Sequence, residues 1–126
     1  MCFINMQYVG QYGTQLTDPT SYAHTVMGQE LGHRWGSFAQ YVDANGQKST
    51  AMLGRDGSHW ASTLQAFGSV MDGNEWEDLG DGRFRVVASN YRFSELDQYI
   101  MGLRGPDEVS DWFLIRDATI NGNEIN

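Results

Sequence analysis

The most constraining feature of this 126-residue sequence is the stretch at residues 25–36, TVMGQELGHRWG. It has the composition of the second half of a helix, and Gly36 suits the left-handed backbone that closes many helices. Upstream, Asp18 and Pro19 are a typical N-cap and first helical residue, although an alternative start places the cap two or three residues later. The sequence therefore predicts one long helix over residues 19–35.

Three polar side chains of this helix are candidates for chemistry. Gln29 and His33 are four residues apart, so they share one helical face and can converge on one metal ion. Glu30 lies beside them, where a carboxylate could hold and deprotonate a metal-bound water. The zinc-peptidase pattern H-E-x-x-H requires His, Glu and His at these three places. Two of the three residues match, and position 29 does not.

The same helix needs a buried side. We expect Val26, Leu31 and Trp35 to form it, with Met27 and Tyr22 contributing. Gly28 and Gly32 are each unfavourable in a helix by about 1 kcal/mol relative to alanine. Because they lie on one face, we expect both to let a neighbouring element approach closely.

The rest of the chain predicts an α+β domain. Short strands are expected at residues 2–9, 38–42, 48–53, 83–89 and 111–120. Ser94 and Asp97 form a capping-box pattern that opens a short second helix. Residues 61–67 fit either a strand or a short helix, and residues 68–82, with five acids and no base, are expected to be an exposed loop. We expect a small, mostly antiparallel sheet packed on the long site-carrying helix.

Composition excludes several classes of partner. The net charge is −8, with no basic stripe, so neither nucleic acid nor an anionic membrane surface is expected to bind. No apolar run reaches the length of a membrane span. The N-terminus lacks the pattern of a signal peptide, so either the protein stays in the cytoplasm or an export signal lies outside this sequence. Localisation is therefore left open.

The length suits one domain over residues 1–126. Asn121-Gly122 is a strong hairpin turn followed by only four residues, from which we expect a fragment of a longer chain. Such a hairpin would leave an unpaired edge strand, and open edges recruit other chains. We therefore expect a homo-oligomer.

Two further histidines are candidates for a metal site. His59, on a glycine-rich loop, is the obvious third side chain to join Gln29 and His33, since a strand, turn and strand can return it to the helix. The alternative is a partly buried loop histidine bonded to backbone. His24 is nine residues before His33, so the two lie on opposite sides of a helix and His24 is not expected to be a ligand.

Two residues are candidates for support of the site. Met71, on a tight turn, could form an apolar floor beneath a metal, or could simply belong to the core. Asp97 could orient a ligand histidine through its carboxylate. Alternatively, Asp97 pairs with exposed backbone N–H groups at the start of its helix.

Four segments in this order resemble a family of bacterial zincin-type metallopeptidase domains: QELGHRWGSF, LGRDGSHWAS, GSVMDGNEW and FSELDQYIMGL. The resemblance spans residues 5–115. It implies a zincin-like fold, a zinc ion with a bound water, and a peptide or protein substrate. By position it implies His33 and His59 as zinc ligands, Glu30 as general base, and Met71 as a Met-turn-like residue.

The departure from that family is Gln29, where the family has histidine. A neutral amide oxygen is a poorer zinc ligand than imidazole. Three alternatives follow: Gln29 ligates weakly, the metal moves to Glu30, His33 and His59, or no metal binds. The leading expectation is a zinc-dependent hydrolase of the metallopeptidase type, weakened by Gln29. The other is an inactive zincin-like scaffold that acts as a binding module, exposing a tryptophan at position 35, 60 or 76.

Overall fold

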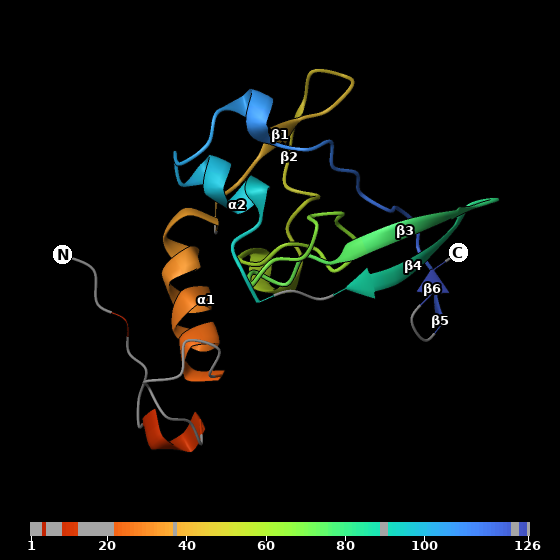
Figure 1. Cartoon of the computed structure of the whole chain (residues 1–126). Helices are drawn as coiled ribbons and strands as arrows, with labels where there is room; N and C mark the ends of the chain where they lie inside the picture. Colours follow the sequence, from red (N-terminus) through yellow and green to blue (C-terminus); the bar gives the residue numbers. More distant parts are fainter. Residues whose placement is uncertain are drawn as a thin grey trace.

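The computed structural model describes residues 4, 9–12, 22–36, 38–88, 91–121 and 124–125. Over these residues the chain is a small α+β protein with two α-helices and two antiparallel sheets (Figure 1). The expected α+β class is confirmed. The expected strand at residues 2–9 falls almost wholly outside the described residues, as does the expected helix start at Asp18 and Pro19.

The long helix is α1 (Tyr22–Gly36), which follows a 3-10 turn, η1 (Val9–Tyr12). Its buried residues are all small: Ala23, Gly32 and Gly36. Leu31, Met27 and Tyr22 are 38%, 44% and 60% exposed, so the expectation that they are buried was wrong. Small residues face the core because a neighbouring segment packs directly against the helix backbone.

The glycines of α1 differ from what the sequence predicts. A Cβ at Gly32 would collide with Sδ of Met71, whereas nothing lies within 4 Å of a Cβ built at Gly28. Close approach therefore occurs at Gly32 alone. Gly36 is the last helical residue and does not adopt the expected left-handed backbone.

The strands form two separate sheets. β1 (Tyr41–Val42) and β2 (Lys48–Ser49) make a two-stranded hairpin that turns at residues 43–47. A four-stranded sheet has the order β3-β4-β6-β5, with β3 (Glu75–Gly80), β4 (Arg83–Ala88), β5 (Ile120–Asn121) and β6 (Glu124–Ile125). The long β3–β4 hairpin projects away from α1 in Figure 1.

Three expectations for the second half of the chain need correction. Residues 68–82 are not an exposed loop: residues 75–80 form β3, because pairing with β4 outweighs their acidic composition and buries Trp76 on the inner side. Residues 111–120 are mostly irregular, meeting residues 63–65 through isolated bonds such as Ile115 N–H to the Thr63 carbonyl (3.1 Å). Residues 61–67 are neither strand nor helix.

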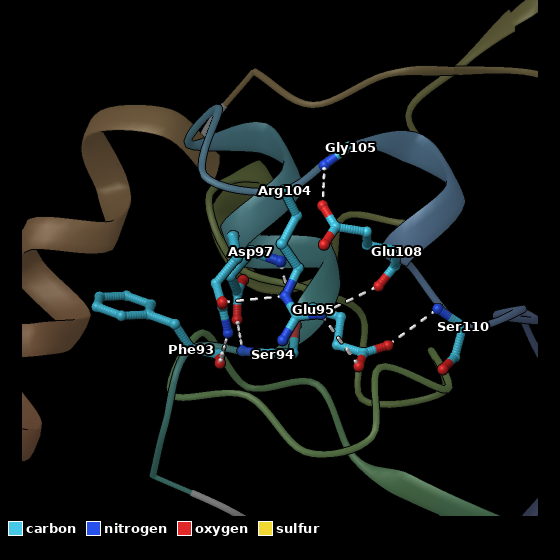
Figure 2. Close-up of polar contacts among 9 residues, drawn as sticks. Phe93, Ser94, Glu95, Asp97, Arg104, Gly105, Glu108 and Ser110 are labelled. Carbon is cyan, nitrogen blue, oxygen red and sulfur yellow. Dashed lines mark hydrogen bonds and ion pairs between the residues drawn. The ribbon is translucent and has the colours of Figure 1, made fainter.

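The second helix, α2 (Glu95–Ile100), begins as the sequence predicts. The Ser94 hydroxyl accepts from the Asp97 N–H at 3.2 Å, and the Asp97 carboxylate accepts from the Ser94 N–H at 2.6 Å (Figure 2). Glu95, the first residue of α2, is also bonded to the segment that follows the helix: its carboxylate accepts from the Ser110 N–H at 2.9 Å. α2 is thus closed at its N-terminus by its own capping box.

The apolar core has two parts. The larger cluster contains Met52, Trp60, Leu64, Ala66, Val70, Met71 and Leu96, and the smaller one joins Trp76 to Ile115 under the hairpin. In the described residues α1 packs mainly on α2 and η1. The expected packing of a sheet on the long helix is therefore replaced by helix and loop contacts, because the hairpin has its own apolar cluster. None of the described helices is long and apolar enough to cross a membrane.

Candidate functional site

The candidate site forms where α1 meets the loop at residues 54–60. Gln29 Nε2 lies 2.6 Å from His33 Nε2 and 2.7 Å from His59 Nε2. The two imidazole rings meet edge to face, with centroids 4.6 Å apart and an interplanar angle of 89°. The structure thus brings together the three side chains that the sequence analysis grouped, on one helix face and one loop.

The proton positions follow from the partners. His33 Nδ1 lies 3.1 Å from the Ser58 carbonyl oxygen, which can only accept, so Nδ1 carries a proton. In the neutral imidazole Nε2 is then an acceptor. Gln29 supplies the donor, because its amide nitrogen is the group that faces Nε2. This tautomer is the one in which the Nε2 lone pair points toward the shared centre.

The loop that carries His59 is held in place from several sides. The His59 carbonyl accepts from the Gly54 N–H at 2.8 Å, and Asp56 and Gly57 turn the chain with φ values of 57° and 64°. A Cβ at Gly54 would lie 2.8 Å from Cα of Ala61, so the two loop ends touch there. His59 is 6% exposed. Its imidazole is therefore presented to α1 by a tightly folded loop.

Asp97 supports this loop through Trp60, the residue next to His59. Its carboxylate is fully buried and accepts from Trp60 Nε1 and Ser69 Oγ, each at 2.6 Å, as well as from the Ser94 N–H. This carboxylate was expected either to orient a ligand histidine or to pair with backbone N–H groups at the start of its helix; it accepts from the Ser94 N–H and from the indole of Trp60, the residue next to His59. The orienting partner of His33 is the Ser58 carbonyl.

Met71 lies beneath α1. Its side chain is 2% exposed and packs against Gly32, the residue before His33. The Met71 carbonyl accepts from the Trp60 N–H at 2.8 Å, which links this turn to the His59 loop. Met71 therefore belongs to the core and at the same time forms the apolar support under the helix turn that carries His33.

A cavity of about 360 Å³ opens over these side chains. Gln29, Glu30, His33 and His59 line it together with Tyr22, Thr25, Val26, Val70, Asp72 and Tyr91. His24 lines a neighbouring cavity instead, in agreement with its expected position off the site. Tyr22, which was expected on the buried side of the helix, and Tyr91, for which no role was expected, are 60% and 76% exposed and stand at the cavity wall.

Two of the three tryptophans considered as exposed ligand-binding residues are buried, whereas Trp35 is half-buried, with the Arg34 guanidinium 5.7 Å from its ring centroid. Trp60 and Trp76 are 2% and 6% exposed. Their indole N–H groups bond to Asp97 and to the Ser62 carbonyl, respectively, so both are core residues with satisfied donors. The exposed aromatic rings at the cavity are tyrosines.

The residues present fit a three-ligand zinc site only in part. The Nε2 atoms of His33 and His59 converge as two zinc-binding imidazoles do, but the space between them holds the amide nitrogen of Gln29, a donor and not a ligand. Within the described residues no three His, Cys, Asp or Glu side chains are grouped so that they could hold a metal. As arranged, the site does not fit zinc.

Comparisons of the chain with protein-family models, with curated proteins and with solved structures find no match. The geometry of the site is therefore the basis for function. The hydrogen bond between His33 and the Ser58 carbonyl could not be predicted from the sequence, because every residue has a backbone carbonyl. Tyr91 could have been noted as an aromatic residue just before the capping box, but nothing in its spacing links it to residue 29.

Proposed function

We propose that this chain is a zincin-like domain that binds a peptide or protein segment in the cavity beside α1 without hydrolysing it. The fold features that support a zincin-like assignment are the long site-carrying helix, the returning loop with His59, and Met71 under the helix. The observation that carries the non-hydrolytic assignment is the position of the Gln29 amide nitrogen, 2.6 and 2.7 Å from the two imidazoles.

The chemistry of the cavity supports a peptide ligand. Two tyrosine rings at its wall, together with Val26 and Val70, offer apolar surface for side chains. Glu30, the two imidazoles and the Gln29 amide supply hydrogen-bonding groups in the same cavity. A mixture of apolar surface and a few convergent polar groups is typical of a ligand site.

The second candidate is the zinc-dependent hydrolase of metallopeptidase type that the sequence places first, weakened by Gln29. The convergence of His33 and His59 beside Glu30 favours it. In that candidate Glu30 is the general base. We place it second because it requires the Gln29 amide to leave the position between the two imidazoles.

One experiment separates the two candidates. Protein purified without a histidine tag is analysed for bound metal and incubated with a peptide library, with and without a chelator, and cleavage and binding are both followed by mass spectrometry. We expect peptide capture with less than stoichiometric zinc and no chelator-sensitive cleavage. Cleavage that a chelator abolishes and Glu30→Gln removes would overturn the non-hydrolytic proposal. Absence of both capture and cleavage would overturn both candidates.

A further inference from the structure

We propose that the Gln29 side-chain amide is a hydrogen-bonded substitute for a metal ion. It joins α1 to the loop at residues 54–60 through two imidazoles and makes the fold of the site independent of metal. This inference goes beyond the proposed function, because it concerns what holds the site together and not what the cavity binds.

The donors and acceptors match in number. A primary amide nitrogen has two N–H groups, and each neutral imidazole protonated at Nδ1 has one acceptor, Nε2. Gln29 Nε2 lies within hydrogen-bond distance of both Nε2 atoms, at 2.6 and 2.7 Å. One amide nitrogen can therefore satisfy both rings at once, as a metal ion satisfies two ligands.

The tautomers that this bridge requires agree with the other contacts. His33 Nδ1 has the Ser58 carbonyl at 3.1 Å, which demands a proton on Nδ1. His59 Nδ1 has the Ser58 hydroxyl at 3.4 Å, a longer contact that also allows a proton there. A flipped amide would present its oxygen to His33 Nε2 and leave two acceptors facing each other.

Burial makes the bridge matter for stability. His59 is 6% exposed, so the hydrogen bond between its Nε2 and the Gln29 amide is made by a buried residue. A buried acceptor without a donor is destabilising, whereas a bridged one is not. The bridge also joins residues 29 and 59, which are far apart in sequence, and so restrains the loop against the helix.

The direct test is Gln29→Met. Methionine has a similar length and a similar helix propensity but no amide, so it removes the bridge with little change in shape. We expect the equilibrium constant for folding, measured by urea unfolding, to fall about tenfold or more. The control is Gln40→Met, which removes an exposed amide outside the helices and should leave the urea midpoint unchanged.

The second readout is the tautomer of each imidazole, observed in long-range proton–nitrogen NMR spectra. In the parent protein we expect both rings as Nδ1–H tautomers with Nε2 accepting. In Gln29→Met we expect the His59 signals to lose this pattern. If that variant is too unstable, Gln29→Asn keeps an amide but is one methylene too short to reach both rings. Unchanged stability and unchanged ring signals in these variants would overturn the proposal.

The third readout is the response to zinc. We expect the urea midpoint of the parent protein to be the same with zinc and with chelator, and that of Gln29→His to rise when zinc is added, because the variant exchanges the amide for a third imidazole. Zinc that stabilises the parent as much as Gln29→His would overturn the proposal. Peptide binding does not enter this test, so its outcome is distinguishable from failure of the proposed function.

Discussion

At the scale of single residues, Gln29 determines how the surrounding histidines can act. With a donor at position 29, the lone pairs of His33 and His59 are both engaged by protein. With histidine at this position, the same two lone pairs and a third would point at a common centre. Whether the three side chains form a hydrogen-bonded cluster or a metal site therefore depends on the residue at position 29. The backbone that positions residues 29, 33 and 59 would be the same in both cases.

The glycines of α1 give a matched pair of variants at the same scale. Gly32→Ala places a methyl group against Met71 Sδ in a packed core, and such overpacking destabilises by about 1–3 kcal/mol. Gly28→Ala meets nothing within 4 Å and should stabilise by about 0.5–1 kcal/mol through helix propensity. Urea unfolding of both variants measures the change in the free energy of unfolding, which should be negative for Gly32→Ala and positive for Gly28→Ala. Equal effects would show that Met71 does not contact the helix as described.

Local patterns in the sequence predicted which side chains lie together at the candidate site, and the reason is physical. The four-residue spacing of Gln29 and His33 determines that they share a helical face whatever the rest of the fold does. The return of His59 to that face was also expected, from the length of the intervening chain. The Ser58 carbonyl could not be expected, because its position depends on a turn through Asp56 and Gly57 that has no side-chain signature.

At the scale of elements, α2 and the turn after it are joined mainly by polar contacts. The Ser110 N–H and side chain lower the pKa of Glu95, followed by the charges of Arg104 and Arg92, while burial opposes this shift. Arg104 Nε donates to the Gln98 side chain at 3.0 Å, and its guanidinium also lies 3.5 Å from the Glu95 carboxylate (Figure 2). These contacts favour the charged form of the Glu95 carboxylate.

This lowered pKa has a consequence for stability in acid. A carboxyl group whose pKa is lower in the folded state stabilises the fold above its unfolded-state pKa, and the contribution disappears as pH falls through the folded-state pKa. We therefore expect Glu95→Gln to reduce the acid dependence of stability below the usual glutamate pKa, measured as Tm against pH. The exposed Asp107→Asn is the control. An unchanged pH profile for Glu95→Gln would contradict the assignment.

The elements also show where sequence reasoning reaches its limit. The capping box of α2 was predicted because it depends on Ser94 and Asp97 alone. The strand β3 was missed because its acidic residues suggested a loop, whereas pairing with β4 decides its conformation. The buried side of α1 was missed because periodicity identifies large apolar residues, and this helix is buried through glycine and alanine.

At the scale of the whole molecule, the four-stranded sheet ends in β3 and β5. β3 carries exposed Glu77 and Asp78, and like charges oppose pairing between two such edges. β5 is therefore the edge at which a second copy of the chain would add, and we expect a mass above 14.2 kDa that rises with concentration. Light scattering over a concentration series measures it, with Ile120→Lys as a variant that should reduce association. A monomer at every concentration would contradict this expectation.

In the described residues the buried Gln65 side chain contributes to the link between the two apolar clusters, alongside the bond from the Trp76 indole to the Ser62 carbonyl. Gln65 is 6% exposed and belongs to the segment between them. Its amide donates to the Trp76 carbonyl at 3.0 Å and accepts from the Trp76 N–H at 2.8 Å, so it bonds to both backbone polar groups of one residue in β3. This contact anchors the β3–β4 hairpin to the half of the protein that contains α1.

Gln65→Met keeps the length of the side chain and removes both bonds. Two buried backbone groups of Trp76 then lose their partner, at a cost of about 1–3 kcal/mol each when buried and unsatisfied. We expect the loss of stability to fall mainly on the hairpin, because α1 and the His59 loop have their own contacts with Met71 and Asp97.

Hydrogen exchange measures this: the amides of β3 and β4 should exchange faster in Gln65→Met, while those of α1 keep the parent rate. The control is Gln47→Met, at an exposed amide in the β1–β2 turn. If α1 and the hairpin lose protection equally, the protein opens as one unit and Gln65 does not separate two parts of it.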